Sequence, residues 1–508
     1  MVRIGRDRRM SASGMSPAGA VFGGATQLSI DPPLPVDMLG FVRRDRSARE
    51  HGTPLLVTAL VLRSDDAAAV IAAADLAGMT PAFAARVREA IAGAVGCRPE
   101  DVLLNSSHTH AAPWPGAAYK LGGEVDDWTA TELAYWDWLP HAFATAALRA
   151  AESAVPIVVS GGTGRAPGIA VNRRERTSDG RTILGWNPEG FLDEEVPAIR
   201  IDAASDGHAV ATIVGFGCHP VVVGPDVAKT GSDFAGPLRE RVEALRGGVC
   251  LFLQGAAGNV LPLEAFHEHE GPEVPFGERL GLEAAHAIAD ADPRTMVVER
   301  LGWGSVTPIS LYRRRALPEQ PAPALAVARR VVPFPLLEIP TAAALEHELA
   351  ERRADLEARR QAGESRVTMN PIRYHIAWLQ RTLAAVREGR AAPASDGEIW
   401  AVRIGETAIV AAPGEIFSEI GAAVRHASPA QTTIFAGYAN GVLGYVATPE
   451  EYPFGGYEPA VAHRGYDHPA PFSPEVAGII ERTAGELLRE LFPTTAATTA
   501  TAARRAAR

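Results

Sequence analysis

Two histidines lie two positions apart directly after an apolar run. His108 and His110 belong to the segment Asn-Ser-Ser-His-Thr-His at 105–110, which follows the apolar residues 102–104. In an extended chain, side chains at positions i and i+2 point to the same side, so both imidazoles would face one side at a strand end. One imidazole can then bind a metal ion while the other orients water or an oxyanion. The alternative is two exposed loop histidines, because an H-x-H pair alone is weak evidence.

Two further polar residues follow apolar runs. His219 comes after the run 210–217, in the sequence Gly-Cys-His-Pro, and Glu415 follows the run 407–411, in the sequence Pro-Gly-Glu. The carboxyl ends of strands are where open α/β sheets bind their ligands, and imidazole and carboxylate groups both bind zinc. The alternatives are a core histidine bonded to the backbone and a glutamate that caps a helix.

The segments that would position these residues alternate between strand-like and helical patterns. Apolar runs occur at 55–62, 67–74, 157–160, 196–201, 210–217, 249–253, 400–404 and 407–411. Helical patterns occur at 81–95, 233–245, 276–289, 418–426 and 474–491. The alternation predicts an α/β fold, with one large domain of mixed sheets flanked by helices.

A helical pair is expected over 345–388, where Ala, Glu, Arg and Leu dominate and only 363–371 forms a break. We interpret it as an insertion near 341–390. The Pro-dense passage 318–340 is either a domain boundary or a surface loop within one domain. We favour the loop, because the polar motifs lie on both sides of it and have to meet in one site.

The composition excludes several classes of protein. Of 508 residues, 47% are hydrophobic and the net charge is -11, which argues against both a disordered chain and a basic nucleic-acid surface. No apolar run is long enough to span a bilayer, and the start lacks the apolar core of a secretory signal, so we expect a soluble, cytoplasmic protein. We expect disordered segments at 1–23 and 493–508, and a single catalytic domain over 24–492.

Six short elements occur in the same order as in one known family. They are Ser-His-Thr-His at 107–110, Cys-His-Pro at 218–220, Ser-Asp at 232–233, Leu-Gln-Gly-Ala-Ala-Gly at 253–258, Pro-Gly-Glu at 413–415 and Gly-Tyr-x-x-Thr-Pro-Glu-Glu-Tyr at 444–452. Together they resemble the neutral or alkaline, non-lysosomal ceramidases, zinc amidases that cleave the N-acyl bond of ceramide. The resemblance runs from about Gly40 to Tyr457 and implies the family's N-terminal catalytic domain, in a divergent bacterial-type form.

The resemblance also implies particular site residues. It implies a zinc ion whose four ligands are His108, His219, Glu415 and Tyr445. It implies three catalytic residues: His110 and Tyr457 beside the metal, and Arg173, which would contact polar substrate atoms. Two imidazoles, a carboxylate and a phenolate are a chemically coherent ligand set for zinc.

The sequence departs from the family at one position that bears on catalysis. The family carries a Gly-Asp-Val-Ser-Pro turn, whereas this chain has Leu261 in the place of the serine, and leucine can neither donate a proton nor act as a nucleophile. We also expect no C-terminal immunoglobulin-like domain. The implied function is zinc-dependent hydrolysis of an amide (N-acyl) bond in a small or lipid-like substrate. The alternative, favoured by Leu261, is a catalytically impaired metal-binding relative that binds a ligand or partner.

Overall fold

The computed structural model of the chain describes residues 19–42, 44, 47–117, 128–289, 293–303, 309–317 and 319–493. Most of the two segments expected to be disordered, 1–23 and 493–508, lies outside these residues. The first strand begins at Phe22, within the first of those segments.

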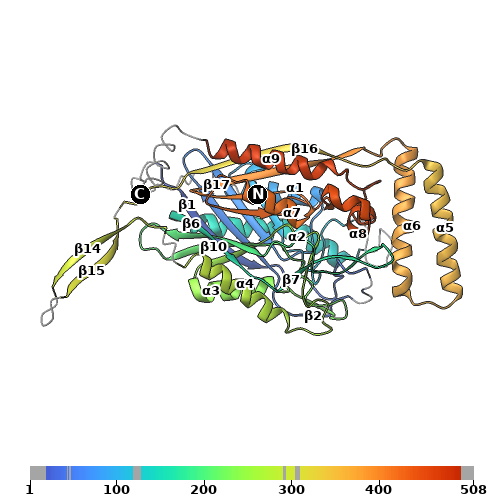
Figure 1. Ribbon diagram of the computed structural model, residues 1–508, viewed down its shortest axis with the longest axis horizontal. Coiled ribbons are helices and arrows are strands. Elements are labelled where there is room, and N and C mark those ends of the chain that lie inside the picture. The colour runs from blue at the N-terminus through green and yellow to red at the C-terminus, as the bar shows by residue number, and fades with distance from the viewer. Residues whose placement is uncertain are drawn as a thin grey trace, which may run out of the picture.

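Two sheets pack face to face at the centre of the molecule (Figure 1). In spatial order, the larger sheet contains β12 (Val249–Gln254), β10 (Ala209–Phe216), β9 (Glu195–Ala203), β6 (Val155–Arg165), β1 (Phe22–Ser29), β3 (Leu56–Arg63), β4 (Ala68–Ala74) and β5 (Val102–Ser106). The smaller one contains β16 (Leu325–Pro335), β17 (Ala394–Ile404), β18 (Thr407–Ala411) and β20 (Thr432–Ala436). Buried side chains such as Ile199 and Leu251 from the first sheet meet Trp400 and Ile434 from the second, which makes this interface the central core.

Helices cover the outer faces of both sheets. On the larger sheet, α1 (Pro81–Val95) and α2 (Ala130–Glu152) cover one half, and α3 (Ala235–Arg246) and α4 (Glu273–Ala287) cover the other. On the smaller sheet lie α7 (Ser418–His426) and α9 (Glu475–Leu491). The result is a four-layer arrangement of helices, sheet, sheet and helices, which confirms the predicted mixed α/β fold. The described residues contain no immunoglobulin-like sandwich after these layers, and none of their helices is long and apolar enough to cross a membrane.

Local sequence signals set the helix ends. The helix α1 begins after Thr80, whose hydroxyl accepts a hydrogen bond from the Phe83 N–H, and Pro81 occupies its first turn. It ends at Gly96, where φ is 70°, a conformation that glycine adopts without steric cost. The observed ends of α1 agree with the helical pattern expected over 81–95.

Several short elements surround the ends of the central strands. They are β2 (Glu50–His51), β7 (Ala170–Arg176), β8 (Thr182–Asn187), β11 (Lys229–Thr230), β13 (Val260–Pro262), β19 (Glu415–Ile416), β21 (Tyr445–Val446), α8 (Tyr457–Ala460) and the 3₁₀ turns η1 (Pro99–Asp101), η2 (Pro449–Phe454) and η3 (Ala462–Tyr466). A three-stranded sheet has the order β13-β7-β8, and β19 pairs in parallel with β21. The pairing matters for the site, because it places Glu415 opposite Tyr445.

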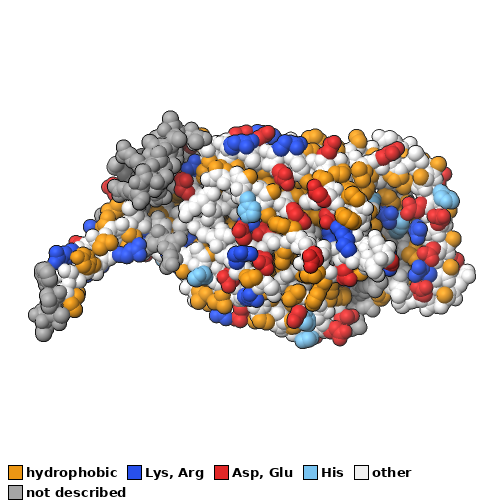
Figure 2. All heavy atoms as spheres, in the orientation of Figure 1, with side chains coloured by type: hydrophobic (Ala, Val, Ile, Leu, Met, Phe, Trp, Pro, Cys, Tyr) orange, Lys and Arg blue, Asp and Glu red, His pale blue; other side chains and the backbone are white. Residues whose placement is uncertain are grey.

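Two hairpins stand out from the layered body (Figure 1). The first is the predicted helical pair, α5 (Ala342–Gln361) and α6 (Arg366–Arg387). The second is an arm of two antiparallel strands, β14 (Met296–Trp303) and β15 (Ser310–Ala316), and Figure 2 shows apolar and basic side chains along it.

Two details of the sequence interpretation were wrong. The break between the paired helices is shorter than 363–371, because the Ser365 hydroxyl accepts from the Thr368 N–H and starts α6, which continues through Pro371. The passage 318–340 is not only a loop, since β16 pairs with β17 along its whole length. β16 is an edge strand, with β17 on one side only. Its prolines are tolerated because a missing backbone N–H on the open side removes no hydrogen bond between strands.

A buried ion pair anchors the segment after β4. The Arg239 guanidinium on α3 donates to both carboxylate oxygens of Asp75, at 2.9 and 2.6 Å. The carbonyls on either side of Asp75, those of Ala74 and Leu76, accept from the backbone N–H groups of Ser107 and His108. The pair therefore holds the backbone that positions His108.

Replacing Arg239 by alanine should lower the free energy of unfolding by about 3–5 kcal/mol, because Asp75 is left buried without its partner. The matched control is Arg241→Ala on the same helix, whose partly exposed ion pair with Glu278 should contribute about 1 kcal/mol or less. Urea unfolding followed by circular dichroism measures both losses. Equal losses in the two variants would contradict a special role for the buried pair.

Candidate metal centre

The carboxyl ends of strands from both sheets meet at one buried junction. The Asn105 side chain at the end of β5 donates to the Gly437 carbonyl at 2.7 Å and accepts from the Gln254 N–H at 2.9 Å. The Gln254 side chain at the end of β12 donates to the carbonyls of Cys218 at 2.7 Å and Ser107 at 3.1 Å. These bonds bring the loops after β5, β10, β12 and β20 together.

His108 enters this junction from a turn rather than from an extended strand. The strand β5 ends at Ser106, and His108 has a φ of 65°. The extended backbone expected for His108 and His110 is therefore wrong. The Nδ1 atom of His108 lies 2.5 Å from the Ala77 carbonyl oxygen. A carbonyl only accepts, so Nδ1 carries the proton and Nε2 is left with a free lone pair.

His219, in the loop after β10, and Glu415, at the start of β19, face His108. The Nδ1 of His219 lies 2.7 Å from the Ala257 carbonyl oxygen, which frees its Nε2 in the same way. That Nε2 lies 3.1 Å from Glu415 Oε2, and the Nε2 of His108 lies 3.4 Å from the same oxygen. The loop after β10 and the start of β19 thus bring an imidazole and a carboxylate to one buried point.

Tyr445 and Arg173 complete the cluster. The Tyr445 hydroxyl lies 3.3 Å from His219 Nε2. Arg173, on β7, donates from Nη2 to that hydroxyl at 3.0 Å, and its Nη1 lies 3.1 Å from His219 Nε2. Its Nε donates to Glu458 at 2.8 Å, so the guanidinium is held on three sides inside the protein.

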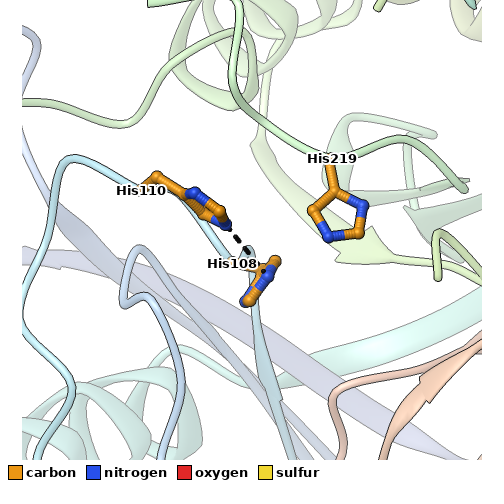
Figure 3. A group of neighbouring side chains, drawn as sticks. All are labelled: His108, His110 and His219. Atoms are coloured by element: carbon orange, nitrogen blue, oxygen red, sulfur yellow. Dashed lines mark hydrogen bonds between the residues drawn. The ribbon is translucent and has the colours of Figure 1, made fainter. Parts of the chain in front are cut away.

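His110 and Tyr457 lie at the edge of the cluster. The Nε2 of His110 is 3.2 Å from the Nε2 of His108, a contact drawn as a dashed line in Figure 3. The buried Nδ1 of His110 has no hydrogen-bond partner among the described residues. Gly40 makes room for this ring, because a Cβ there would lie 2.4 Å from it. Tyr457 is 36% exposed, with its ring centroid 5.6 Å from that of Tyr445.

Three of the six spacings among the donor atoms of His108, His219, Glu415 and Tyr445 are close to those of a tetrahedral site. Ligand atoms about 2.0–2.2 Å from a tetrahedral zinc ion lie about 3.3–3.6 Å apart, and the contacts to Glu415 and Tyr445 given above are 3.1 to 3.4 Å. The three histidines also form a group whose nitrogens lie within 4.8 Å of one another (Figure 3). Two ligand sets are therefore compatible with the geometry, and both contain His108 and His219.

The protonation states suit metal binding. Burial, and secondly the charge of Arg173, lowers the pKa of His219 to about 4, and burial likewise lowers the pKa of His108. Burial alone would raise the pKa of Glu415, but the facing histidines outweigh it and bring that pKa below its usual range. Neutral imidazoles beside a carboxylate are the forms that coordinate metals.

Three site residues escaped the sequence analysis as functional residues. Tyr438 donates to Glu415 Oε2 at 3.2 Å, and Tyr466 donates to Glu415 Oε1. Glu458 accepts from Arg173 and, at 2.6 Å, from Arg174. Glu458 directly follows Tyr457, and Tyr438 lies six residues before the matched element that begins at Gly444, so both lie close to residues that the sequence singles out. Tyr466 lies beyond the last matched element.

Leu261 lies in a small apolar cluster beside the site. It is opposite Val171 in the β13–β7 pairing and packs with Val171 and Val221. The hydroxyls of Ser106 and Ser107 are buried and lack hydrogen-bond partners among the described residues. Leu261 thus packs as an apolar residue, and Ser106 and Ser107 carry buried hydroxyls with open hydrogen-bonding capacity just before His108 in the chain.

The sequence matches no family model and no curated protein. The structure, however, is similar to solved structures of ceramidases. A neutral ceramidase from Pseudomonas aeruginosa has a TM-score of 0.65 and 17% identity, over 94% of this chain and 76% of that chain. A structure described as ceramidase complexed with C2 has a TM-score of 0.65 and 16% identity, over 92% of this chain and 75% of that one. This chain therefore has the fold of the neutral ceramidases.

Proposed function

We propose that this protein is a zinc-dependent hydrolase that cleaves an amide (N-acyl) bond with a metal-activated water. The observation that carries the proposal is the buried convergence of two neutral imidazoles, a carboxylate and a phenol on one point. We propose His108, His219, Glu415 and Tyr445 as the ligands. The substrate class that the fold favours is a lipid-like N-acyl compound, with ceramide as the first to test.

When bound, zinc lowers the pKa of a coordinated water to about 7 and polarises a carbonyl oxygen. The residues of the chain prepare this chemistry. The carbonyls of Ala77 and Ala257 fix the rings of His108 and His219 with Nε2 inward. Burial raises the pKa of Tyr445 well above its usual value, and the Arg173 guanidinium, which donates to its hydroxyl, offsets part of that rise.

Three residues have proposed roles around the scissile carbonyl. His110, whose Nε2 already faces the cluster, and Tyr457, which is partly exposed, would donate hydrogen bonds to the developing oxyanion. Arg173 would contact polar substrate atoms. Because its side chain is only 4% exposed and already bonded to Glu458, a substrate would have to share its donors with Tyr445 or His219.

A second candidate function is ligand binding without turnover. The observation in its favour is Leu261, which occupies the position where the resemblance places a serine and which packs against Val171 and Val221. In that case the metal centre would bind an N-acyl compound or a partner without cleaving it. Turnover of N-acyl substrates with and without a chelator separates the two functions.

The metal-site prediction is one zinc ion per chain in the wild type and loss of that ion in His219→Ala. The substitution removes an imidazole that contacts both Glu415 and Tyr445. His208→Ala is the control, because this histidine is exposed in the turn before β10. Inductively coupled plasma mass spectrometry counts the metal, and full zinc content in His219→Ala would exclude the proposed ligand set.

His110→Ala should keep the metal and lose about 10²-fold or more in turnover, because one oxyanion donor is missing. Zinc content and turnover of an N-acyl substrate are measured on the same preparation. Loss of the metal instead would show that His110 is a ligand, as in the three-histidine set.

Leu261→Ser should raise the turnover of ceramide if the missing hydroxyl limits the reaction. Leu261→Ala is the matched control, since it opens the same cavity without a hydroxyl. Both variants should lose about 2–5 kcal/mol of stability, because the leucine is buried with Val171 and Val221. Efficient ceramide cleavage by the wild type, with no gain from serine, would identify Leu261 as a packing residue only.

A further inference from the structure

The two oxygens of Glu415 have different partners. Oε2 faces the Nε2 atoms of His108 and His219, at 3.4 and 3.1 Å. Oε1 accepts a hydrogen bond from the Tyr466 hydroxyl. Tyr438 also donates to Oε2, at 3.2 Å, so Tyr466 at Oε1 and Tyr438 at Oε2 together fix the plane of the carboxylate. Tyr466 is the partner on the oxygen that does not face the histidines.

The Tyr466 ring fits a space prepared for it. Gly444 has a φ of 130°, and a Cβ added there would lie 3.3 Å from the ring carbons of Tyr466. The Trp114 ring lies 5.9 Å away and the Tyr445 ring 6.0 Å away, centroid to centroid. The ring is thus packed among residues of the site, while its hydroxyl reaches Glu415.

The residues next to Tyr466 are bound by the helical hairpin α5–α6. The Trp378 indole N–H donates to the His468 carbonyl at 2.8 Å, and the Arg381 Nε donates to Asp467 at 2.8 Å. On the other side of Tyr466, the Arg464 guanidinium lies over the Trp378 ring, 5.1 Å from its centroid. α6 therefore contacts the chain on both sides of Tyr466, through the Arg464 side chain before it and through the Asp467 side chain and the His468 backbone after it.

The hairpin is built as a separate brace. Leu345 and Leu349 of α5 pack with Trp378, Leu379 and Leu383 of α6 in a hydrophobic cluster of their own. In Figure 1 the hairpin stands at the end of the molecule where α8 lies. Its internal core gives α6 a rigid surface against which η3, and with it Tyr466, can be held.

From this arrangement we propose that Tyr466 is a positioning residue that orients Glu415 for metal binding, and that α5–α6 holds Tyr466 in place. The inference rests on the proposed metal site. Outer partners of a metal ligand typically change metal affinity by about 10–100-fold. The physical reason is that an unheld carboxylate loses conformational freedom when the ion binds, and this cost weakens binding.

The test is the zinc affinity of Tyr466→Phe, measured by competition with a coloured chelator. The substitution keeps the ring and removes only the hydroxyl, so the expected result is about 10–100-fold weaker binding. The matched control is Tyr452→Phe, because the Tyr452 hydroxyl donates to the Phe472 carbonyl at 2.8 Å in the same region. It should bind zinc as the wild type does. Thermal unfolding of the metal-free proteins shows whether the folded states are comparable.

The role of the hairpin is tested by Arg381→Ala, which removes the bond to Asp467 but lies outside the site. It should weaken zinc binding, whereas Arg387→Ala on the same helix, whose partner Glu346 is on α5, should not. This pair also decides the matter if Tyr466→Phe does not fold. Equal zinc affinities in the two arginine variants would overturn the role of the hairpin.

Two outcomes separate this inference from the proposed function. A wild-type protein that takes up no zinc would overturn both. A wild-type protein that binds zinc, together with a folded Tyr466→Phe variant of equal affinity, would overturn only the positioning role of Tyr466.

Discussion

The two sheets end at the same buried place, and two amide side chains satisfy the backbone there. At a strand end, the last carbonyl and N–H groups lose their ladder partners, and each one left unpaired in the interior costs about 1–3 kcal/mol. The Asn105 side chain accepts from the Gln254 N–H on β12 and donates to the carbonyl of the loop residue Gly437, and the Gln254 side chain donates to the carbonyl of the loop residue Cys218. Because His219 and Tyr438 directly follow these two loop residues, the amide network fixes where the site can form.

A second constraint is the burial of charge. Arg173 and Arg174 share the carboxylate of Glu458, so these charges are paired inside the protein. Glu415 is different, because its hydrogen-bond and ion-pair partners are neutral histidines and tyrosine hydroxyls. A buried carboxylate whose direct partners carry no formal charge is costly. The nearby guanidinium of Arg173 contacts His219 and Tyr445 rather than Glu415, and it is already paired with Glu458. A cation at this point would offset that cost, which is the electrostatic basis of the proposed metal centre.

The residues that form the cluster make several hydrogen bonds each, whereas the residues that surround it make few contacts with it. The strand ends, the histidine rings and Glu415 are tied to backbone groups or to one another, so a substitution there disturbs several bonds. Leu261 and the α5–α6 hairpin contact the site through packing or through one tyrosine. Under the proposed function, substitutions at these places would change substrate choice or metal affinity while disturbing few contacts of the fold, and a fold shared at 17% identity fits that division.

The sequence alone predicted the α/β class, most strands of the two central sheets, the long helices other than α2, and five residues of the candidate site: His108, His219, Glu415, Tyr445 and Arg173. It did so because apolar periodicity records which face is buried, and because short motifs around His108, His219 and Glu415 keep their order along the chain. It did not predict β1, β20 or α2. The edge strand β16 was not predicted because prolines normally argue against a strand. They are tolerated in β16 because it has a partner strand on one side only. The left-handed turn at His108, the pairing of Glu458 with two arginines and the contact of Tyr466 with Glu415 were decided by the tertiary structure. Each of them depends on contacts between segments that are far apart in the chain, and a local sequence pattern does not show which distant segments come into contact.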